Sequence, residues 1–291
     1  MLNSMIEVNL FDSSFIHTEK MLGYITCSDT LKPTKIKWLN GLMEYNGITI
    51  FTDNYIGHPV IDQVKSKVKI AWLLEPRVID SRTYGIITTI EDKFDYVLTY
   101  DTELLKRGDK YIKYVVAQSR VSDEDSRIHD KSKMVSMIAS HKTISNGHKY
   151  RHEIFRNLHN KHRFDMWGSG YRRFDSKRDP LKDYYFSISV MNSKVDNFFT
   201  EVLVDNFRLG TIPIFWGCPN IGEYFDERGI ITFDTIEELD DILSNLDIKY
   251  YTDRLDYIQK NLIISNNYVS TDDIIADILI KKFYEDTSIR F

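Results

Sequence analysis

The polar residues best suited to chemistry lie close together in one stretch of the chain, between two apolar runs. These residues are Asn192, Ser193, Lys194, Thr200 and Glu201. Amide, hydroxyl and ammonium groups donate hydrogen bonds to phosphate or sugar oxygens, whereas a carboxylate repels phosphate and suits the hydroxyls of a ribose or sugar. The structural alternative is helix capping by Asn, Ser and Thr, and stabilisation of a helix N-terminus by Glu. The stretch is therefore our first candidate for a nucleotide-binding loop.

The residues around this loop predict the elements that would position it. Residues 184–190 form an apolar and aromatic run long enough for a buried strand, and residues 211–216 form a second one. Between them, apolar residues recur at i, i+4, i+5 and i+8 from Phe199, which indicates a helix, and Gly210 suits its C-cap. Such strand–helix–strand units are typical of parallel α/β sheets, which bind ligands beyond the carboxyl ends of their strands. A helix N-terminus at that edge can hold a phosphate.

The size and composition of the chain favour two globular domains. The chain has 291 residues, 42% of them hydrophobic and 28% charged. No apolar stretch approaches the ~18–20 residues that a membrane span needs, and the N-terminus lacks the pattern of a signal peptide. The two cysteines, Cys27 and Cys218, are too far apart to suggest a disulfide framework or a metal site, so each is expected to be a buried thiol. We therefore expect a cytoplasmic protein with no membrane partner.

Strand and helix patterns alternate along the chain, which predicts an α/β fold with helices on both faces of parallel sheets. In the first half, strands are expected at residues 5–11, 48–51, 68–74, 96–100 and 111–116, a helix at 32–45, and short helical links at 84–93 and 102–107. In the second half, strands are expected at residues 134–139, 164–167, 184–190, 211–216 and 230–233, and helices at 148–160, from 236, at 253–264 and at 272–284.

A polar segment without apolar periodicity, residues 119–133, is the predicted linker between the two halves. It implies an N-terminal Rossmann-like domain at residues 1–125 and a C-terminal Rossmann-like domain at 126–270. The remaining residues, 271–291, carry an amphipathic helix that we expect to pack on a domain surface.

The charges of the chain are unevenly distributed. The net charge of −5 does not favour wholesale wrapping of nucleic acid. However, residues 142–182 contain eleven Lys or Arg against four Asp or Glu, and five of the eight histidines fall between His141 and His162. Acidic residues gather from Glu223 onward. We therefore expect one basic surface that faces an anion.

Two segments of the chain resemble the donor-binding motif of family 10 glycosyltransferases, the α1,3/4-fucosyltransferase-like enzymes. These segments read FSISVMNS at residues 186–193 and FFTEVLVDNFRLGTIPIFWG at 198–217, and the resemblance to the same family extends to residues 140–158, 72–76 and 94–101. The resemblance covers about residues 67–243. It implies a GT-B fold, with an acceptor domain and a nucleotide-sugar donor domain facing across a cleft. It also implies an inverting mechanism, a nucleotide sugar as co-substrate, and no obligatory metal or other cofactor.

The resemblance implies roles for particular residues. Glu75 would be the base that takes the proton of the acceptor hydroxyl, and partial burial at the end of an apolar strand would raise its pKa. Arg151 would bind the donor diphosphate with its guanidinium fork. A helix-capping carboxylate and a solvated arginine are the structural alternatives. The other donor-binding candidates are Asn192, Ser193, Lys194, Thr200, Glu201, His141, Lys149 and Gly168.

Two positions depart from the family pattern. Met191 stands where the pattern has a glutamate, and Val202 stands where it has a lysine that is expected near the donor phosphates. Lys194, Arg151 and Lys149 are the candidates to replace that charge. The departures leave open whether the donor is a GDP-sugar or a UDP-sugar.

Metal and acceptor are addressed by weaker signals. His148 and His152 lie one turn apart, but no third ligand is evident, and the acidic run at 123–125 falls in the polar linker, so we expect no metal site. The acceptor is expected to be a glycan or another hydroxyl. A hydroxymethylated DNA base is an alternative acceptor, because the size and composition of the chain suit a viral or phage protein, which would act in the host cytoplasm. The basic run at 161–182 could then bind DNA phosphates. A non-catalytic nucleotide-sugar-binding module is a second alternative.

Overall fold

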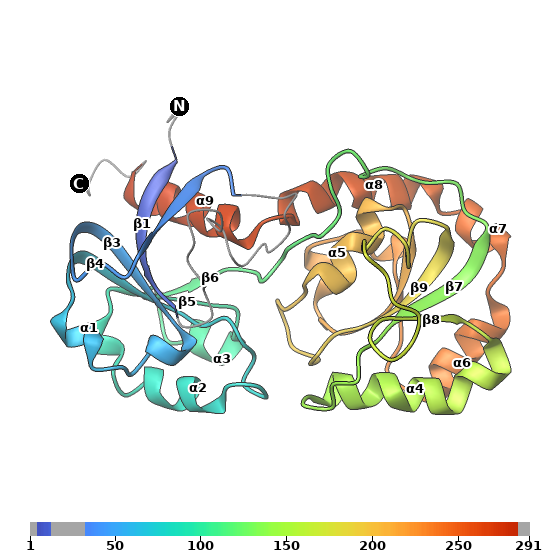
Figure 1. Ribbon diagram of the computed structural model, residues 1–291, viewed down its shortest axis with the longest axis horizontal. Coiled ribbons are helices and arrows are strands. Elements are labelled where there is room, and N and C mark those ends of the chain that lie inside the picture. The colour runs from blue at the N-terminus through green and yellow to red at the C-terminus, as the bar shows by residue number, and fades with distance from the viewer. Residues whose placement is uncertain (1–4, 13–32, 285–291) are drawn as a thin grey trace. The chain divides into compact units, whose positions relative to one another are not determined.

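The computed structural model describes residues 5–12 and 33–284, and these form two compact units (Figure 1). The N-terminal unit contains the chain up to Val116 together with the residues from Ser270 onward, and the C-terminal unit contains Ala117–Val269. The chain therefore enters the C-terminal unit earlier than the boundary at residue 126 that the sequence suggested. Cys218 is buried, and Cys27 lies outside the described residues.

The N-terminal unit is built on a six-stranded parallel sheet of order β2-β1-β3-β4-β5-β6. Its strands are β1 (Ile6–Phe11), β2 (Ile36–Asn40), β3 (Glu44–Thr52), β4 (Lys65–Trp72), β5 (Tyr96–Thr99) and β6 (Tyr111–Lys113). Its helices are α1 (Val60–Gln63), α2 (Ser81–Ile87), α3 (Thr102–Leu105) and α9 (Thr271–Phe283). The parallel pairing confirms the α/β class expected from the alternating pattern.

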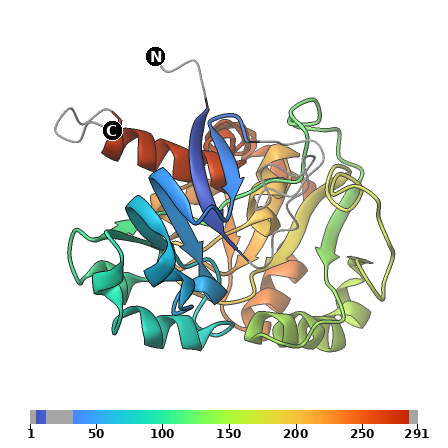
Figure 2. The ribbon, with the colours of Figure 1, turned by 60° about the vertical axis from the view of Figure 1, so that its left-hand side comes forward.

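The C-terminal helix α9 packs on the sheet of the N-terminal unit, beside β1 and β2 (Figure 2). The indole Nε1 of Trp38 donates a hydrogen bond to Asp272 Oδ1 over 3.0 Å, and Phe283 packs edge-on against Tyr96 at a centroid distance of 5.5 Å. The ammonium of Lys35 lies 2.6 Å from Asp277. Buried apolar and polar contacts at both ends of α9 thus hold this helix on the N-terminal unit.

The helix predicted at residues 32–45 is wrong, because this region contains the strand β2, a turn and the start of β3. Along β2, burial alternates in the strand period of two, and Val8 pairs with the buried Trp38 in a parallel ladder. Gly41 then reverses the chain with a φ of +57°, and Leu42 and Met43 are exposed. The apolar spacing fits a helix by coincidence, whereas pairing with β1 determines the structure.

The C-terminal unit is built on a five-stranded parallel sheet of order β11-β10-β9-β7-β8. Its strands are β7 (Lys133–Ile138), β8 (Asp165–Trp167), β9 (Tyr184–Val190), β10 (Ile212–Trp216) and β11 (Ile231–Thr232). Its helices are α4 (Asn146–His162), α5 (Glu201–Arg208), α6 (Ile236–Asn245), α7 (Ile248–Thr252) and α8 (Leu255–Ser265). A core of apolar side chains from β7, β9 and β10 packs against α4, α6 and α8. The strand–helix–strand unit predicted around residues 184–216 is confirmed as β9-α5-β10.

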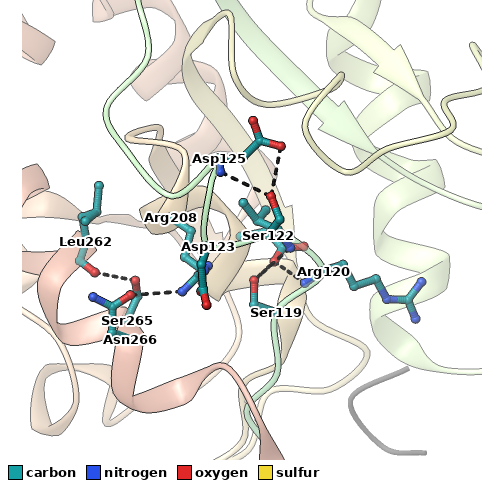
Figure 3. A network of polar contacts seen from close by, with 11 residues as sticks. Ser119, Arg120, Ser122, Asp123, Asp125, Arg208, Leu262, Ser265 and Asn266 are labelled. Carbon is teal, nitrogen blue, oxygen red and sulfur yellow. Dashed lines mark hydrogen bonds and ion pairs between the residues drawn. The ribbon is translucent and has the colours of Figure 1, made fainter. Parts of the chain in front are cut away.

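The segment predicted to be a solvated linker, residues 119–133, instead packs into the C-terminal unit (Figure 3). Ser119 is buried and its hydroxyl donates to Asp205 Oδ1 on α5 over 2.7 Å, while the backbone N–H of Arg120 donates to the same oxygen over 2.9 Å. The fully buried Arg208 of α5 donates to Asp123 over 2.6 Å. The prediction failed because the segment is held mainly by polar side chains of α5, and its few apolar contacts, such as buried Val121 against Leu181 and Leu209, follow no periodic pattern. Among the described residues, no helix is long and apolar enough to cross a membrane.

Candidate functional site

A cavity of about 240 Å³ lies in the C-terminal unit, at the carboxyl ends of its strands. Its walls come from residues 138–140 after β7, 168–169 after β8, the second half of β9 and the first turns of α5, together with the segment 174–181. Its charged lining residues are Arg120, Arg151, Lys177 and Glu201. Three cations against one carboxylate make this a basic cavity, at the sheet edge where the sequence predicted a nucleotide.

Arg151 reaches the cavity from α4 and is held firmly in place. Its Nε donates to the carbonyl oxygen of Val190 over 2.9 Å, and one terminal nitrogen donates to the same oxygen and, over 3.3 Å, to Asn192 Oδ1. Among the described residues, its other terminal nitrogen has no hydrogen-bond partner. Burial lowers the pKa of Arg151 to about 10, although the charge of Glu201 opposes the shift, so the guanidinium is still charged at neutral pH. One edge of the guanidinium thus fixes the loop after β9.

Contacts at the start of α4 fix the position of the helix that carries Arg151. Ser145 is the N-cap of the helix: its hydroxyl accepts the N–H of His148, whose ring contacts Ser145 in return, which makes a capping box. Gly147 lies so close to the next loop that a Cβ there would be 1.8 Å from the carbonyl oxygen of Met191. His148 is therefore a capping residue. Among the described residues, no group of three or more His, Cys, Asp or Glu could hold a metal.

Glu201 lies at the first turn of α5 and lines the cavity. The side-chain amide of Gln118 donates to its carboxylate over 3.0 Å. Burial favours the neutral form of Glu201, but the charges of Lys177 and Arg120 and the Gln118 hydrogen bond outweigh it and hold its pKa below the ordinary value. Thr200 is the N-cap of the helix, and its hydroxyl accepts the N–H of Val202 over 3.4 Å. An ionised carboxylate at this wall suits ribose or sugar hydroxyls.

The loop residues Asn192, Ser193 and Lys194 lie beside the cavity lining but do not form part of it. Asn192 accepts hydrogen bonds from Arg151 and, through its carbonyl, from the N–H of Gly147 over 3.0 Å. The buried hydroxyl of Ser193 has no hydrogen-bond partner among the described residues. Lys194 forms an ion pair with Asp234, so its charge is already engaged. Two of the three residues thus have structural contacts of their own.

Gly168 follows β8, and because it has no side chain, two segments of the cavity wall can lie close together at this position. Its φ is +109°, and a Cβ at this position would lie 2.0 Å from the carbonyl oxygen of Ala139. Gly170 plays a similar part, because its Cβ would lie 1.9 Å from Cε1 of the exposed His141. His141 and Lys149 are exposed and do not line the cavity. Of the predicted donor-binding residues, the structure therefore places Arg151, Glu201 and Gly168 on the cavity.

Lys177 and Arg120 line the cavity, but the sequence did not single them out. Lys177 belongs to the basic run at residues 161–182, which carried no signal for one lysine over another. Arg120 lies in the segment taken for a linker. Neither residue follows a local pattern, since the fold alone brings them to the cavity.

Glu75, the predicted base, lies in the N-terminal unit three residues after β4. Its carbonyl oxygen accepts a hydrogen bond from Tyr84 over 2.9 Å, and its side chain is exposed. The partial burial that we expected for this carboxylate is therefore wrong, because the chain has already left the sheet at Trp72. Burial instead affects Asp53, a half-buried residue directly after β3 that accepts the N–H of Leu74 over 2.9 Å.

Asp53 is the carboxylate of this region with the most perturbed acidity. Burial raises its pKa to about 7, the negative charges of Glu75, Asp80 and Asp12 add to the rise, and the hydrogen bond from Leu74 opposes it. A group with a pKa near neutral can exchange protons at neutral pH. The signal in the sequence was its place directly after an apolar strand.

Comparisons with known proteins agree with this geometry. Residues 128–259 match the family model described as glycosyltransferase family 10 (fucosyltransferase), C-terminal part. No curated protein sequence matches the chain. A solved α1,3-fucosyltransferase is 16% identical over 94% of this chain and 89% of that chain, with a TM-score of 0.61. The structure of an α1,3-fucosyltransferase with GDP-fucose is 15% identical over the same shares, with a TM-score of 0.57.

A third similar structure comes from a different kind of enzyme. An α-glucosyltransferase in complex with UDP-glucose and DNA containing an abasic site is 11% identical over 84% of each chain, with a TM-score of 0.54. At these identities the likeness establishes the fold, which is of the GT-B type. The sequence-based expectation of a GT-B fold is confirmed.

Proposed function

We propose that this chain, which is a glycosyltransferase of family 10, binds the nucleoside diphosphate of a sugar donor in the basic cavity of its C-terminal unit. The observation that carries the proposal is the position of the cavity. It lies at the carboxyl ends of parallel strands, within the region that matches the family, and three of its four charged lining residues are cations. Such a site attracts a diphosphate and offers Glu201 to hydroxyl groups.

In the proposed reaction, an acceptor hydroxyl attacks the anomeric carbon of the donor sugar with inversion. The new bond joins the acceptor oxygen to the anomeric carbon, and the bond from that carbon to the phosphate oxygen breaks. The electron pair of the broken bond goes to the departing diphosphate, which Arg151 stabilises with the guanidinium edge that Val190 and Asn192 leave free. Glu75 takes the proton of the acceptor hydroxyl.

The donor is a nucleotide sugar, either a GDP-sugar or a UDP-sugar, and fucose or a related sugar is the first candidate. Family 10 is described by fucosyltransferase activity, and one structure similar to this chain contains GDP-fucose while another contains UDP-glucose. The motif that places this chain in the family departs from the pattern at Met191 and Val202, so the family name does not decide the nucleotide.

A thermal-shift panel of GDP-, UDP-, CMP- and dTDP-sugars tests donor binding. A ligand at about 100 times its Kd stabilises the folded state by about 2.7 kcal/mol, which gives a clear shift. One nucleotide class should raise the melting temperature, and the sugar should then be transferred to an oligosaccharide acceptor panel. Absence of a shift with every donor would contradict the proposal.

Glu75→Gln tests the base. We expect kcat to fall by about 10²–10⁴ with unchanged donor affinity, because general-base catalysis contributes about that much. The control is Glu103→Gln, which removes another exposed carboxylate of the N-terminal unit and should leave kcat unchanged. Donor binding without turnover in the parent enzyme would instead favour a non-catalytic binding module.

DNA is the second candidate acceptor. Arg163, Arg172 and Arg173 are exposed within the basic run at residues 161–182, and the fold is shared with an enzyme whose structure contains DNA. Binding to hydroxymethylated DNA should then fall steeply with salt, because each neutralised phosphate releases counterions. Salt-insensitive transfer to a neutral oligosaccharide would exclude this candidate in favour of a glycan.

A further inference from the structure

One wall of the cavity lacks the cation that the family motif would place there. Val202 occupies the position of the motif lysine, and its side chain lines the cavity. A diphosphate beside this wall would lose one point charge, which is a large effect because charged hydrogen bonds contribute about 1.5–3 kcal/mol each. Another cation of the cavity would have to take over this role. The inference that follows rests on the proposed function.

The three residues that the sequence offered as replacements are unsuited to it. Lys194 is paired with Asp234, and Lys149 is exposed and does not line the cavity. Arg151 does line it, but two of its nitrogens bond Val190, and it has its own place in the family pattern. Arg151 therefore does not compensate for a second missing cation.

Lys177 has the properties that the role requires. It is half-buried, lines the cavity with Val202 and Glu201, and its ammonium lies 5.9 Å from the centroid of the Phe174 ring. Among the described residues, no carboxylate lies within 4.0 Å of this ammonium. It nevertheless acts on two carboxylates of α5, Glu201 and Asp205, whose ionised forms it favours. Lys177 therefore lies on the cavity lining together with residues of α5, and its charge is available to a ligand.

Arg120 brings a second cation to the same wall. Its backbone N–H is fixed by Asp205 Oδ1, which also accepts the hydroxyl of Ser119. Its side chain extends away from these contacts (Figure 3) and lines the cavity, where its charge also favours ionised Glu201. The anchored backbone thus holds Arg120 at the cavity.

We propose that Lys177, assisted by Arg120, binds the donor diphosphate in place of the motif lysine that is absent at Val202. The ammonium and a phosphate oxygen form the charged contact, and the carboxylate of Glu201 remains for the ribose or sugar hydroxyls. In this chain the phosphate-binding cation thus comes from the segment that follows β8 and not from the helix α5. A basic residue at either position faces the same cavity, since Val202 and Lys177 both line it.

The test compares diphosphate binding with nucleoside binding in four proteins: the parent chain, Lys177→Met, Val202→Lys and the double variant. Methionine keeps the length and most of the apolar stem of lysine but has no charge. Isothermal titration with GDP, UDP, guanosine and uridine gives the Kd of each. Lys182→Met is the control, because Lys182 is a half-buried lysine of the same segment that does not line the cavity.

We expect Lys177→Met to weaken diphosphate binding by about 10- to 100-fold and to leave nucleoside binding within about twofold, because only the phosphate contact is lost. Lys182→Met should leave both unchanged. The double variant should recover most of the lost diphosphate affinity, since the lysine returns to the motif position. Arg120→Met should weaken diphosphate binding more than nucleoside binding, though less than Lys177→Met does.

Three results overturn the inference, and they are distinguishable. If the parent binds a diphosphate and Lys177→Met binds it equally well, Lys177 does not hold the phosphates, but the proposed function stands. If the parent binds no nucleoside diphosphate, both the inference and the proposed function fail. Equal losses of diphosphate and nucleoside affinity in Lys177→Met, without recovery in the double variant, would mean a structural role and would also overturn the inference.

Discussion

Replacing Asp53 by asparagine should stabilise the N-terminal unit relative to the parent, and this gain should be larger at pH 8 than at pH 5. Burial raises the pKa of Asp53 from the ordinary 3.8 to about 7, and the charges of Glu75, Asp80 and Asp12 add to the rise. The folded state therefore holds this proton more tightly than the unfolded state does. Its contribution to stability is fully present below pH 4 and is lost as the pH rises to about 7.

The size of the effect follows from the shift. The rise of the pKa from 3.8 to about 7 corresponds to about 4 kcal/mol of free energy between the two protonation states. This is the upper limit of the stability that the folded state loses above pH 7. Asparagine has a similar shape, and its carbonyl oxygen can still accept the N–H of Leu74. It carries no charge, so the variant avoids the cost of ionisation. As upper limits, its gain should be about 2 kcal/mol at pH 5 and about 4 kcal/mol at pH 8, and it should vanish below about pH 3.

Urea unfolding followed by tryptophan fluorescence measures this gain. Of the four tryptophans, Trp38 and Trp72 belong to the N-terminal unit, so a background with Trp167→Phe and Trp216→Phe reports on that unit alone. Asp53→Asn is compared with the same background at pH 5, 6, 7 and 8.

The control is Asp95→Asn, an exposed carboxylate that also accepts a backbone N–H, from Lys69 over 2.8 Å. Its effect should stay within about 0.5 kcal/mol and should not change with pH. A gain for Asp53→Asn that is the same at pH 5 and pH 8, or a loss at pH 8, would refute the reasoning.

Two further predictions concern Gly168, in a wall of the cavity, and Ser145, the N-cap of the helix that carries Arg151. Gly168→Ala should destabilise the C-terminal unit by several times the ~1 kcal/mol of ordinary backbone strain, because the new Cβ would lie 2.0 Å from the carbonyl oxygen of Ala139. The control is Gly108→Ala, at a φ of +125°. A Cβ at residue 108 would have nothing within 4 Å, so this variant should cost only the backbone strain. Equal melting temperatures for the two variants would contradict this. Ser145→Ala should cost about 1 kcal/mol in urea unfolding, because it removes the cap shared with His148, and an unchanged midpoint would show that the cap contributes nothing.

The parts of the fold that the sequence predicted correctly are those with strong local signals. The unit β9-α5-β10 was predicted because two buried apolar runs enclose an amphipathic helix that Gly210 terminates with a φ of +67°. The region 32–45 was predicted wrongly because its apolar spacing fits a helix, while its structure depends on pairing with β1, which is distant in sequence. Local periodicity cannot report such a partner.

The lining of the cavity was predicted only in part, for a similar reason. Arg151, Glu201 and Gly168 were among the predicted donor-binding residues, and the structure places all three on the cavity lining. Lys177 and Arg120 have no motif. Lys194 was a reasonable candidate by position, but its partner Asp234 is forty residues away in sequence, and only the fold brings the two together.

Peptide-resolved hydrogen exchange of the full chain, with and without the nucleoside diphosphate that binds, tests the central claim most directly. A ligand in the cavity should slow exchange in its walls, in peptides that contain residues 138–140, 168–169, 174–181, 187–189 and 201–206, and leave the sheet of the N-terminal unit unchanged. Protection confined to other segments, or none at a saturating concentration of nucleotide, would contradict the assignment of this cavity as the donor site.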